Sequence, residues 1–230
     1  MAAKDKGNGR PPDPLIQKGV FHLSPSQPDP ILFYRRLARL LPPRASLLDL
    51  ACGDGVFLRE ALARGATRAL GVEISESGVL NCVQSGLSVY HGDITEGLTS
   101  YPDGSFDCVS LIRTLELLPK PEPVLDEMLR VGREVLVTFT NFGHLRHGLR
   151  YLFTGTVPGA VKASLGGPPS RLTLPLFRKY CRSHAIEIVQ ITPLPLTWRA
   201  RVLPSLFARE FAVRVRRALN STGRAQDPSA

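Results

Sequence analysis

Three acidic side chains stand at the ends of three successive short apolar segments. Asp49 lies near the end of segment 46–51, Glu73 ends the next one 24 residues later, and Asp93 follows the third. Short apolar segments of this kind are typical of buried strands. In an open parallel sheet, ligands bind at the edge where the carboxyl ends of the strands meet. The pattern therefore predicts a group of carboxylates that attracts a cation or accepts hydrogen bonds from a ligand.

A glycine loop follows the first segment and narrows the choice of ligand. Gly53 and Gly55 let backbone amides approach a ligand at the start of the next helix, as in phosphate-binding loops. Asp49 and Asp54 would repel a pyrophosphate there, however, and the third glycine of a dinucleotide motif is absent. The ligand is therefore expected to be cationic or zwitterionic. S-adenosyl-L-methionine fits, because it carries a sulfonium and an ammonium group and only one carboxylate.

The other two acids have an expected partner on that cofactor. Glu73 would accept hydrogen bonds from both ribose hydroxyls, and Asp93 would accept one from the adenine amino group. Taken singly, each acid is better explained as a helix cap or a solvated turn, but three acids ending three successive strands favour a binding site. The predicted cofactor-binding residues are Asp49, Ala51, Gly53, Gly55, Glu73, Ile74, Asp93, Ile94 and Ile112.

Strands that alternate with short helices must position these residues. Such alternation implies parallel β-α-β units in a sheet that is covered on both faces. The last segment, 209–218, alternates apolar residues with arginines, which predicts an antiparallel edge strand with one solvent-exposed face. The other strands are expected at 46–51, 68–74, 87–93, 106–112, 133–141 and 186–193, and the helices at 31–41, 57–65, 75–86, 123–132 and 173–185.

One domain is predicted to span residues 28–217, with disordered tails at 1–27 and 218–230. With 43% hydrophobic residues among 230, the chain is long enough to bury a full core. The opening residues lack the apolar core of a secretory signal, and no stretch reaches the roughly 18 apolar residues of a membrane span. Four scattered cysteines without zinc-ligand spacing predict reduced thiols, no metal site and a cytoplasmic location.

The positive charge is concentrated in the second part of the chain. Residues 135–230 carry 14 Lys and Arg against 3 Asp and Glu, whereas residues 1–134 carry 15 against 17. A basic half fits nucleic acid, an anionic substrate or an acidic protein surface, and it equally fits a solvated face. The arginines expected to rim the pocket and attract an anion are Arg146, Arg150, Arg171 and Arg178.

Several segments resemble one protein family in their order along the chain. The segments "LLDLACGDG", "GVEISESGVLNCVQSG", "FDCVSL" and "PLFRKYC" resemble those of the methionine biosynthesis protein MetW family, a branch of the class I S-adenosylmethionine-dependent methyltransferases. The resemblance covers roughly residues 45–190. It implies an α/β, Rossmann-like class I methyltransferase fold with a mostly parallel seven-stranded sheet. It also implies a role in methionine biosynthesis beside homoserine O-acyltransferase.

One residue departs from the family pattern inside the cofactor loop. Ala51 stands where such motifs usually carry glycine. The change is tolerable in a tight turn, although it is not neutral.

The residues that could act on a methyl acceptor follow the fourth and fifth strands. Thr114 lies in "RTLE", which is not the Asn/Asp-Pro-Pro-aromatic motif of amino-group methylation. Asn141 and His144 begin a segment that is expected to form a helix over the acceptor pocket, with His144 as a base or an orienting group. The alternative is a helix whose polar face carries histidines without a catalytic role.

Three functions are compatible with these residues. The first is a methyltransferase that acts on a small-molecule or anionic acceptor. The second is a non-catalytic S-adenosylmethionine-binding partner or regulator of homoserine O-acyltransferase. The third, an RNA-directed methyltransferase, is weaker because the basic half lacks the interleaved aromatic residues on which single-stranded RNA stacks. No membrane partner is expected.

Overall fold

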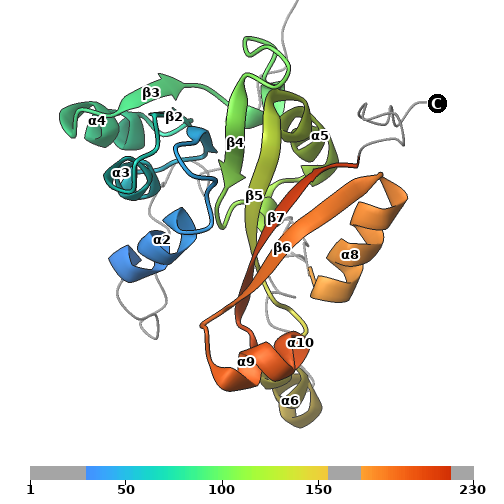
Figure 1. Ribbon diagram of the computed structural model, residues 1–230. Helices are drawn as coiled ribbons and strands as arrows, with labels where there is room; N and C mark the ends of the chain where they lie inside the picture. Colours follow the sequence, from blue (N-terminus) through green and yellow to red (C-terminus); the bar gives the residue numbers. More distant parts are fainter. Residues whose placement is uncertain (1–29, 155–171, 219–230) are drawn as a thin grey trace, which may run out of the picture.

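A computed structural model describes residues 30–154 and 172–218, which form one seven-stranded sheet with helices on both faces (Figure 1). Apart from Ala218, the predicted tails 1–27 and 218–230 lie outside the described residues. The strands are β1 (Ser46–Leu50), β2 (Arg68–Glu73), β3 (Ser88–His91), β4 (Phe106–Leu111), β5 (Gly132–Thr140), β6 (Ile186–Leu194) and β7 (Glu210–Arg217). The helices are α2 (Pro30–Ala38), α3 (Val56–Ala63), α4 (Glu76–Gln84), α5 (Pro121–Val131), α6 (Leu145–Thr154), α8 (Leu174–Ser183), α9 (Trp198–Val202) and α10 (Pro204–Phe207), with short 3-10 helices η1 (Ile94–Glu96) and η2 (Leu115–Leu117).

The strand order is β3-β2-β1-β4-β5-β7-β6, with neighbours parallel from β3 to β5 and only β7 running the other way. The predicted α/β class and mostly parallel seven-stranded sheet are therefore confirmed. After β1 the chain builds β2 and β3 on one side and then returns to place β4 on the other. This reversal leaves a crevice at the carboxyl ends of β1 and β4, which is where open parallel sheets bind ligands.

Two clusters of buried hydrophobic side chains fill the space between the sheet and the helices on its two faces. One cluster joins α5 and α8 to one face of the sheet, and the other joins α2, α3 and α4 to the opposite face (Figure 1). Leu47 and Leu48 of β1 enter different clusters because successive strand residues point to opposite faces. Asp49 therefore lies on the face that α2 and α3 cover, although it stands among apolar neighbours.

The last strand was predicted at the edge of the sheet, and this position is wrong by one strand. β7 runs antiparallel, as expected, but it lies between β5 and β6, so β6 is the edge strand. Its arginines are only partly exposed to solvent, and Arg214 is more enclosed than Arg216, whose side chain is 43% exposed. The Arg214 side chain is 20% exposed, makes an ion pair with Glu134 at 3.1 Å and donates a hydrogen bond to the Leu40 carbonyl at 2.6 Å. A charged residue can occupy an inner strand when partners compensate its burial.

Three short helices stand beyond the carboxyl end of β5. α6 follows β5, and α9 and α10 join β6 to β7 (Figure 1). The sequence did not predict α9 and α10, which are only 5 and 4 residues long and cannot show helical periodicity. Among the described residues, no helix is long and apolar enough to cross a membrane.

Arg214→Ala is expected to lower the free energy of unfolding by about 1–3 kcal/mol, because it leaves Glu134 and the Leu40 carbonyl without their partner. Arg216→Ala is the matched control two residues along the same strand. Its ion pair with Glu187 is exposed on both sides, so its loss should leave stability nearly unchanged. Urea unfolding of both variants measures the difference. Equal losses would show that Arg214 is no more important to the fold than a surface arginine.

Candidate functional site

The loop after β1 uses left-handed backbone at three of its residues. Ala51, Gly53 and Gly55 have φ values of 52°, 55° and 70°. A Cβ on Gly55 would lie 2.3 Å from the Leu87 side chain, whereas a Cβ on Gly53 would meet nothing within 4 Å. Gly55 is therefore required for packing as well as for its conformation, whereas the space where a Gly53 side chain would stand is empty. Ala51 adopts its conformation at a cost of about 1 kcal/mol, so the departure from glycine is tolerated here.

Asp49 is a buried carboxylate at the floor of the crevice. Its side chain is 2% exposed and accepts a hydrogen bond from the Ser110 hydroxyl of β4 at 2.5 Å. Burial raises the pKa of Asp49 to about 7, against the lowering effect of the Ser110 hydrogen bond and with a further increase from nearby Glu73. No Lys or Arg among the described residues pairs with it. An uncompensated acid of this kind favours a cationic ligand.

Glu73, at the end of β2, ties the cofactor loop to the start of α4. One carboxylate oxygen accepts a hydrogen bond from the Gly53 amide at 2.8 Å, and the other accepts one from the Ser75 amide at 2.9 Å. Each oxygen retains a second lone pair, which can accept a hydroxyl proton. Gly78 of α4 packs close by, since a Cβ there would lie 3.0 Å from the Glu73 side chain.

The segment after β3 brings the third acid to the same edge of the sheet. One Asp93 oxygen accepts hydrogen bonds from the Thr95 amide and hydroxyl at 2.8 and 2.7 Å, which starts η1. Ile94 is buried, and Ile74 is half-buried with its carbonyl 2.9 Å from a His91 ring nitrogen. Asp49 and Glu73 are thus brought together, while Asp93 lies at the end of the neighbouring strand.

A largely buried ion pair at the end of β4 was not predicted from the sequence. Arg113 has a φ of 57° and follows buried Ile112, and its guanidinium donates two hydrogen bonds to Glu210 at 3.0 and 2.9 Å. The guanidinium also lies over the Phe33 ring, 3.8 Å from its centre. Arg113 and Glu210 are 97 residues apart, so no spacing in the sequence could have shown that they pair.

Helix α2 contributes an aromatic side chain beside the acids. Tyr34 packs edge-on against Phe33, with 5.2 Å between ring centres, and against Phe57 of α3. Burial raises the pKa of the Tyr34 hydroxyl, Arg113 opposes that increase, and Asp49 adds to it. Tyr34 therefore lies within electrostatic range of both Arg113 and Asp49.

Two of the three predicted catalytic candidates, Thr114 and Asn141, use their polar groups inside the fold. Thr114 donates its hydroxyl to the Ile112 carbonyl at 3.0 Å. Asn141 is fully buried and donates to the carbonyls of Ser205 and Ala208 at 2.9 and 2.8 Å. These contacts connect the end of β5 to α10 and indicate a structural role for Asn141.

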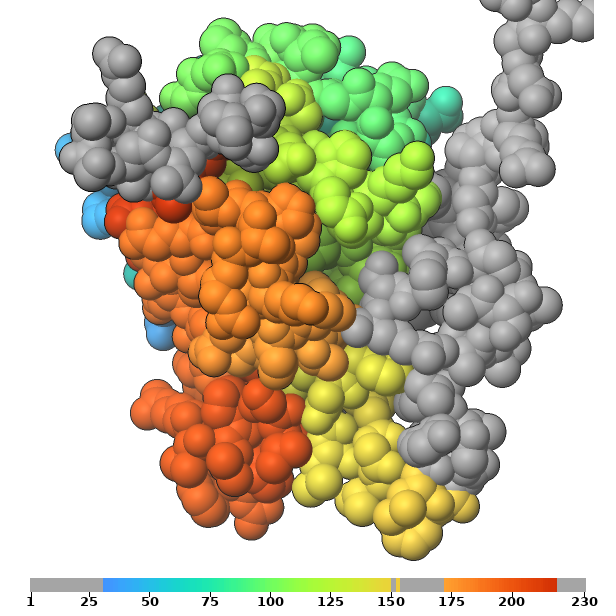
Figure 2. Space-filling model, turned by 90° about the vertical axis from the view of Figure 1, so that its right-hand side faces the viewer, coloured from blue at the N-terminus to red at the C-terminus, as the bar shows by residue number. Residues whose placement is uncertain are grey.

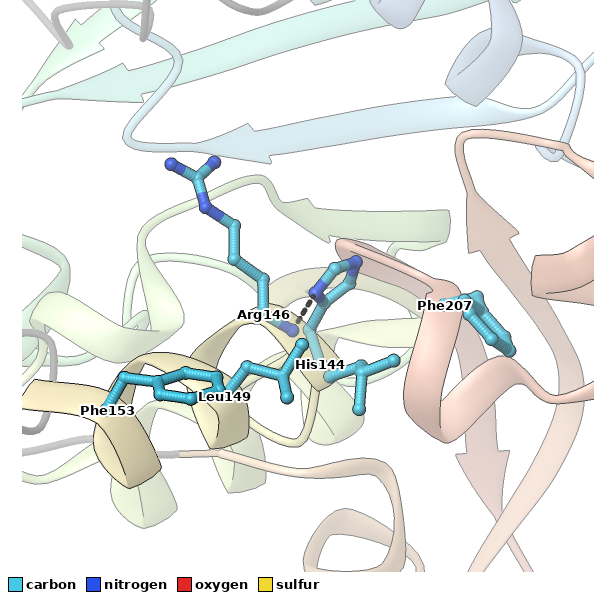
Figure 3. A pocket seen from close by; sticks show the side chains of 6 residues that line it. His144, Arg146, Leu149, Phe153 and Phe207 are labelled. Atoms are coloured by element: carbon cyan, nitrogen blue, oxygen red, sulfur yellow. Dashed lines mark hydrogen bonds between the residues drawn. The ribbon is translucent and has the colours of Figure 1, made fainter.

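His144 stands at the start of α6 and lines a pocket with it (Figure 3). Its Nδ1 accepts a hydrogen bond from the Arg146 amide at 3.0 Å. Burial lowers the pKa of His144, and His147, Arg209 and Arg146 lower it further. The neutral ring therefore carries its proton on Nε2, which makes it a donor toward the pocket and not a base.

The arginines that were predicted to rim one pocket do not all lie at the same pocket. Arg146 lines the pocket at α6, whereas Arg178 lines a separate groove between α8 and β6. Arg171 and the side chain of Arg150 lie outside the described residues.

All four cysteines are free, and Cys82, Cys108 and Cys181 are buried. Two of them meet beneath the cofactor loop, where the Cys52 and Cys82 sulfur atoms are 4.0 Å apart. Burial raises the pKa of both thiols, so they stay protonated. Among the described residues, no three His, Cys, Asp or Glu side chains cluster as a metal site requires.

The sheet order, the glycine loop and the acids at the strand ends define a class I methyltransferase fold. The chain belongs to the family of the methionine biosynthesis protein MetW, whose family model matches residues 33–165. Solved structures share the fold. An S-adenosylmethionine dependent methyltransferase from Mesorhizobium loti superposes with a TM-score of 0.57 at 15% identity over 79% of this chain and 96% of that chain. A possible histamine N-methyltransferase from Thermotoga maritima gives 0.58 at 18% identity over 81% and 88%.

Curated relatives with higher identity carry two different descriptions. A bifunctional methionine biosynthesis protein MetXA/MetW from Rhodopirellula baltica is 33% identical over 54% of this chain, which matches only 21% of that protein's length. A ubiquinone biosynthesis O-methyltransferase from Nitrosococcus oceani is 30% identical over 68% of this chain and 70% of its own length.

We expect Asp49→Asn to raise the free energy of unfolding of the cofactor-free protein at pH 8 by about 1–3 kcal/mol. The pKa of Asp49 is about 7 in the folded protein and about 4 in the unfolded chain. The contribution of the protonated Asp49 carboxyl to the free energy of unfolding is therefore fully present below about pH 4, and it is lost as the pH rises through 7. Asparagine does not ionise, so the gain should disappear toward pH 4. Urea unfolding at pH 4, 6 and 8 measures it.

Asp54→Asn is the matched control, because Asp54 is an exposed carboxylate of the same loop. The free energy of unfolding of Asp54→Asn, relative to the unmodified protein, should not rise with pH in this way. A gain for Asp49→Asn that was equal at all three pH values would contradict the buried, partly protonated state of Asp49.

Proposed function

We propose that the protein binds S-adenosyl-L-methionine at the carboxyl ends of β1, β2 and β3 and transfers its methyl group to a small-molecule or anionic acceptor in methionine biosynthesis. The observation that carries the proposal is Asp49, a buried acid without a cationic partner among the described residues, with Glu73 close beside it. A ligand with an ammonium and a sulfonium group compensates this charge. A dinucleotide would add negative charge to the same place.

The residues around the loop fit the parts of this cofactor. The free lone pairs of Glu73 suit the two ribose hydroxyls, and the second oxygen of Asp93 suits the adenine amino group. Ile74, Ile94 and Ile112 supply apolar surface for the adenine ring. When bound, S-adenosylmethionine supplies an electrophilic methyl group on sulfur. The empty space where a Gly53 side chain would stand lets the amino acid part of the cofactor approach the loop.

The acceptor is proposed to enter at the carboxyl end of β4, beside the Arg113–Glu210 ion pair. Phe33 and Glu210 hold the Arg113 guanidinium in place on two sides. Glu116 closes the same edge, where it accepts a hydrogen bond from the Thr140 amide. Burial raises the pKa of Glu116, although the hydrogen bonds from Thr140 oppose that increase. Positioning of an acceptor that is already nucleophilic is the chemistry that these residues support best.

Glu73→Ala is expected to weaken S-adenosylmethionine binding by about 1.5–3 kcal/mol, because hydrogen bonds to a charged carboxylate are lost. Isothermal titration calorimetry measures the affinity, with NAD as a ligand that should bind little. Glu76→Ala is the matched control, since Glu76 is an exposed acid in the first turn of α4. Thermal unfolding of both variants separates a lost contact from a disturbed loop. Unchanged affinity in Glu73→Ala would remove Glu73 from the site.

A second candidate function is a non-catalytic partner or regulator of homoserine O-acyltransferase. The Rhodopirellula baltica relative supports it, because its description places MetXA and MetW in one bifunctional chain. The contacts of Thr114, Asn141 and His144 also support it, since none of the three offers a free base. In this function S-adenosylmethionine would bind at the cofactor site and thereby change the activity of the acyltransferase, which would bind elsewhere on the surface.

Release of S-adenosylhomocysteine separates the two functions. The purified chain is incubated with S-adenosylmethionine and homoserine, with and without homoserine O-acyltransferase from the same organism. For the methyltransferase we expect release above background that Asp49→Ala abolishes. Faster acylation of homoserine without any release would instead identify the regulator and reject methyl transfer under these conditions.

A further inference from the structure

Helices α6, α9 and α10 carry apolar side chains that the fold does not cover. Leu152 and Phe153 of α6 are 75% and 80% exposed, and Trp198 and Val202 of α9 are 71% and 69% exposed. Isolated exposed leucines are ordinary on protein surfaces, but a group of large apolar side chains on neighbouring helices marks an interaction site. We call the exposed apolar side chains of α6, α9 and α10 the helical patch.

A groove runs along the helical patch between α6 and α10. It offers about 520 Å³ of space, is open to solvent, and is lined by His144, Leu145, Arg146, Leu149, Phe153 and Phe207. Figure 2 shows a furrow between the surface of α6 and that of α9 and α10. In Figure 3, the α6 side chains and Phe207 of α10 come from opposite sides of this space. The groove is therefore concave and mainly apolar.

The walls of the groove are fixed before anything binds. Asn141 joins them, because its buried amide donates hydrogen bonds to the carbonyls of Ser205 and Ala208 and accepts one from the Gly143 amide at 3.0 Å. The Phe142 ring stacks on His147 at 5.4 Å between centres, which also holds α6 in place. A preformed groove loses little conformational entropy on binding. Such a groove suits a partner of complementary shape.

The segment of chain that carries α6, α9 and α10 is rich in positive charge. Between Glu134 and Glu210 the chain has one acid, Glu187, which pairs with Arg216 on β7. Arg199 and Arg201 of α9 make no ion pair with any described carboxylate, and Arg199 lies over the Trp198 ring at 5.4 Å. An apolar groove with arginines beside it complements an apolar surface that is bordered by carboxylates.

We propose that the groove between α6 and α10, with the helical patch around it, is the docking surface for a folded protein that presents an amphipathic helix flanked by carboxylates. The fixed, concave groove favours a protein over a lipid bilayer, because a fluid, flat surface would leave it unfilled. An apolar helix lying in a groove is a common mode of recognition. This inference rests on the proposed association with homoserine O-acyltransferase, which provides the protein probe for its test.

The test compares binding of the full chain and its variants to three probes. The probes are homoserine O-acyltransferase from the same organism, vesicles of phosphatidylcholine with phosphatidylglycerol, and the chain itself in sedimentation velocity. The patch variants are Phe153→Asp and the double variant Arg199→Glu/Arg201→Glu. The control is Leu80→Asp, because Leu80 of α4 is 55% exposed and lies outside the helical patch. Thermal unfolding and S-adenosylmethionine affinity confirm that each variant keeps its fold.

We expect the unmodified chain to bind the acyltransferase, and both patch variants to bind it at least tenfold more weakly. Leu80→Asp should stay within about twofold, and S-adenosylmethionine affinity within about threefold, for every variant. The arginine variant should also lose part of the salt dependence of binding.

Three results would overturn the docking surface. Unchanged acyltransferase binding by both patch variants would reject the surface and leave the association itself standing. Binding to vesicles, or self-association, that the same variants abolish would assign the helical patch to lipid or to a second copy. Failure of the unmodified chain to bind the acyltransferase would reject both the association and the surface. The titration with S-adenosylmethionine would still test the cofactor binding of the methyltransferase proposal separately.

Discussion

The hydrogen bonds of the Glu73 carboxylate hold the ligand edge of the sheet together. They join the end of β2 to the loop after β1 through the Gly53 amide and to the start of α4 through the Ser75 amide. Gly78 allows α4 to pack against this junction, where a Cβ would lie 3.1 Å from the Gly53 carbonyl. The left-handed loop, the end of β2 and the cap of α4 are therefore fixed relative to one another by one buried side chain.

Asp49 and Arg113 show two ways of placing charge in the same crevice. Arg113 is compensated by Glu210 and Phe33, so it is a rigid part of the acceptor side. Among the described residues, Asp49 has only the Ser110 hydroxyl as a hydrogen-bond partner, and its pKa of about 7 reflects the cost of burying its ionised form. When a cation binds beside Asp49, its attraction to the ionised carboxylate offsets the free-energy cost of burying that charge. The carboxylate thus reduces stability in exchange for selectivity.

The arginines that make the chain basic serve separate purposes. Arg113 and Arg214 are enclosed in ion pairs that connect β7 to the rest of the sheet. Arg199 and Arg201 stand on α9 beside the helical patch, without a described carboxylate partner. The excess positive charge is therefore partly structural and partly exposed on the surface.

The sequence alone determined the strands, most of the helices and the acids of the cofactor edge. Apolar runs fix strands locally, and strands of one direction must end at one edge, so Asp49, Glu73 and Asp93 could be placed without coordinates. Only the tertiary structure decided that Arg113 pairs with Glu210, that β7 lies inside the sheet, and that Asn141 joins α6 to α10. These contacts join residues 64 to 97 positions apart. Periodicity reports which face of an element is apolar, but it carries no information about which distant partner meets that face.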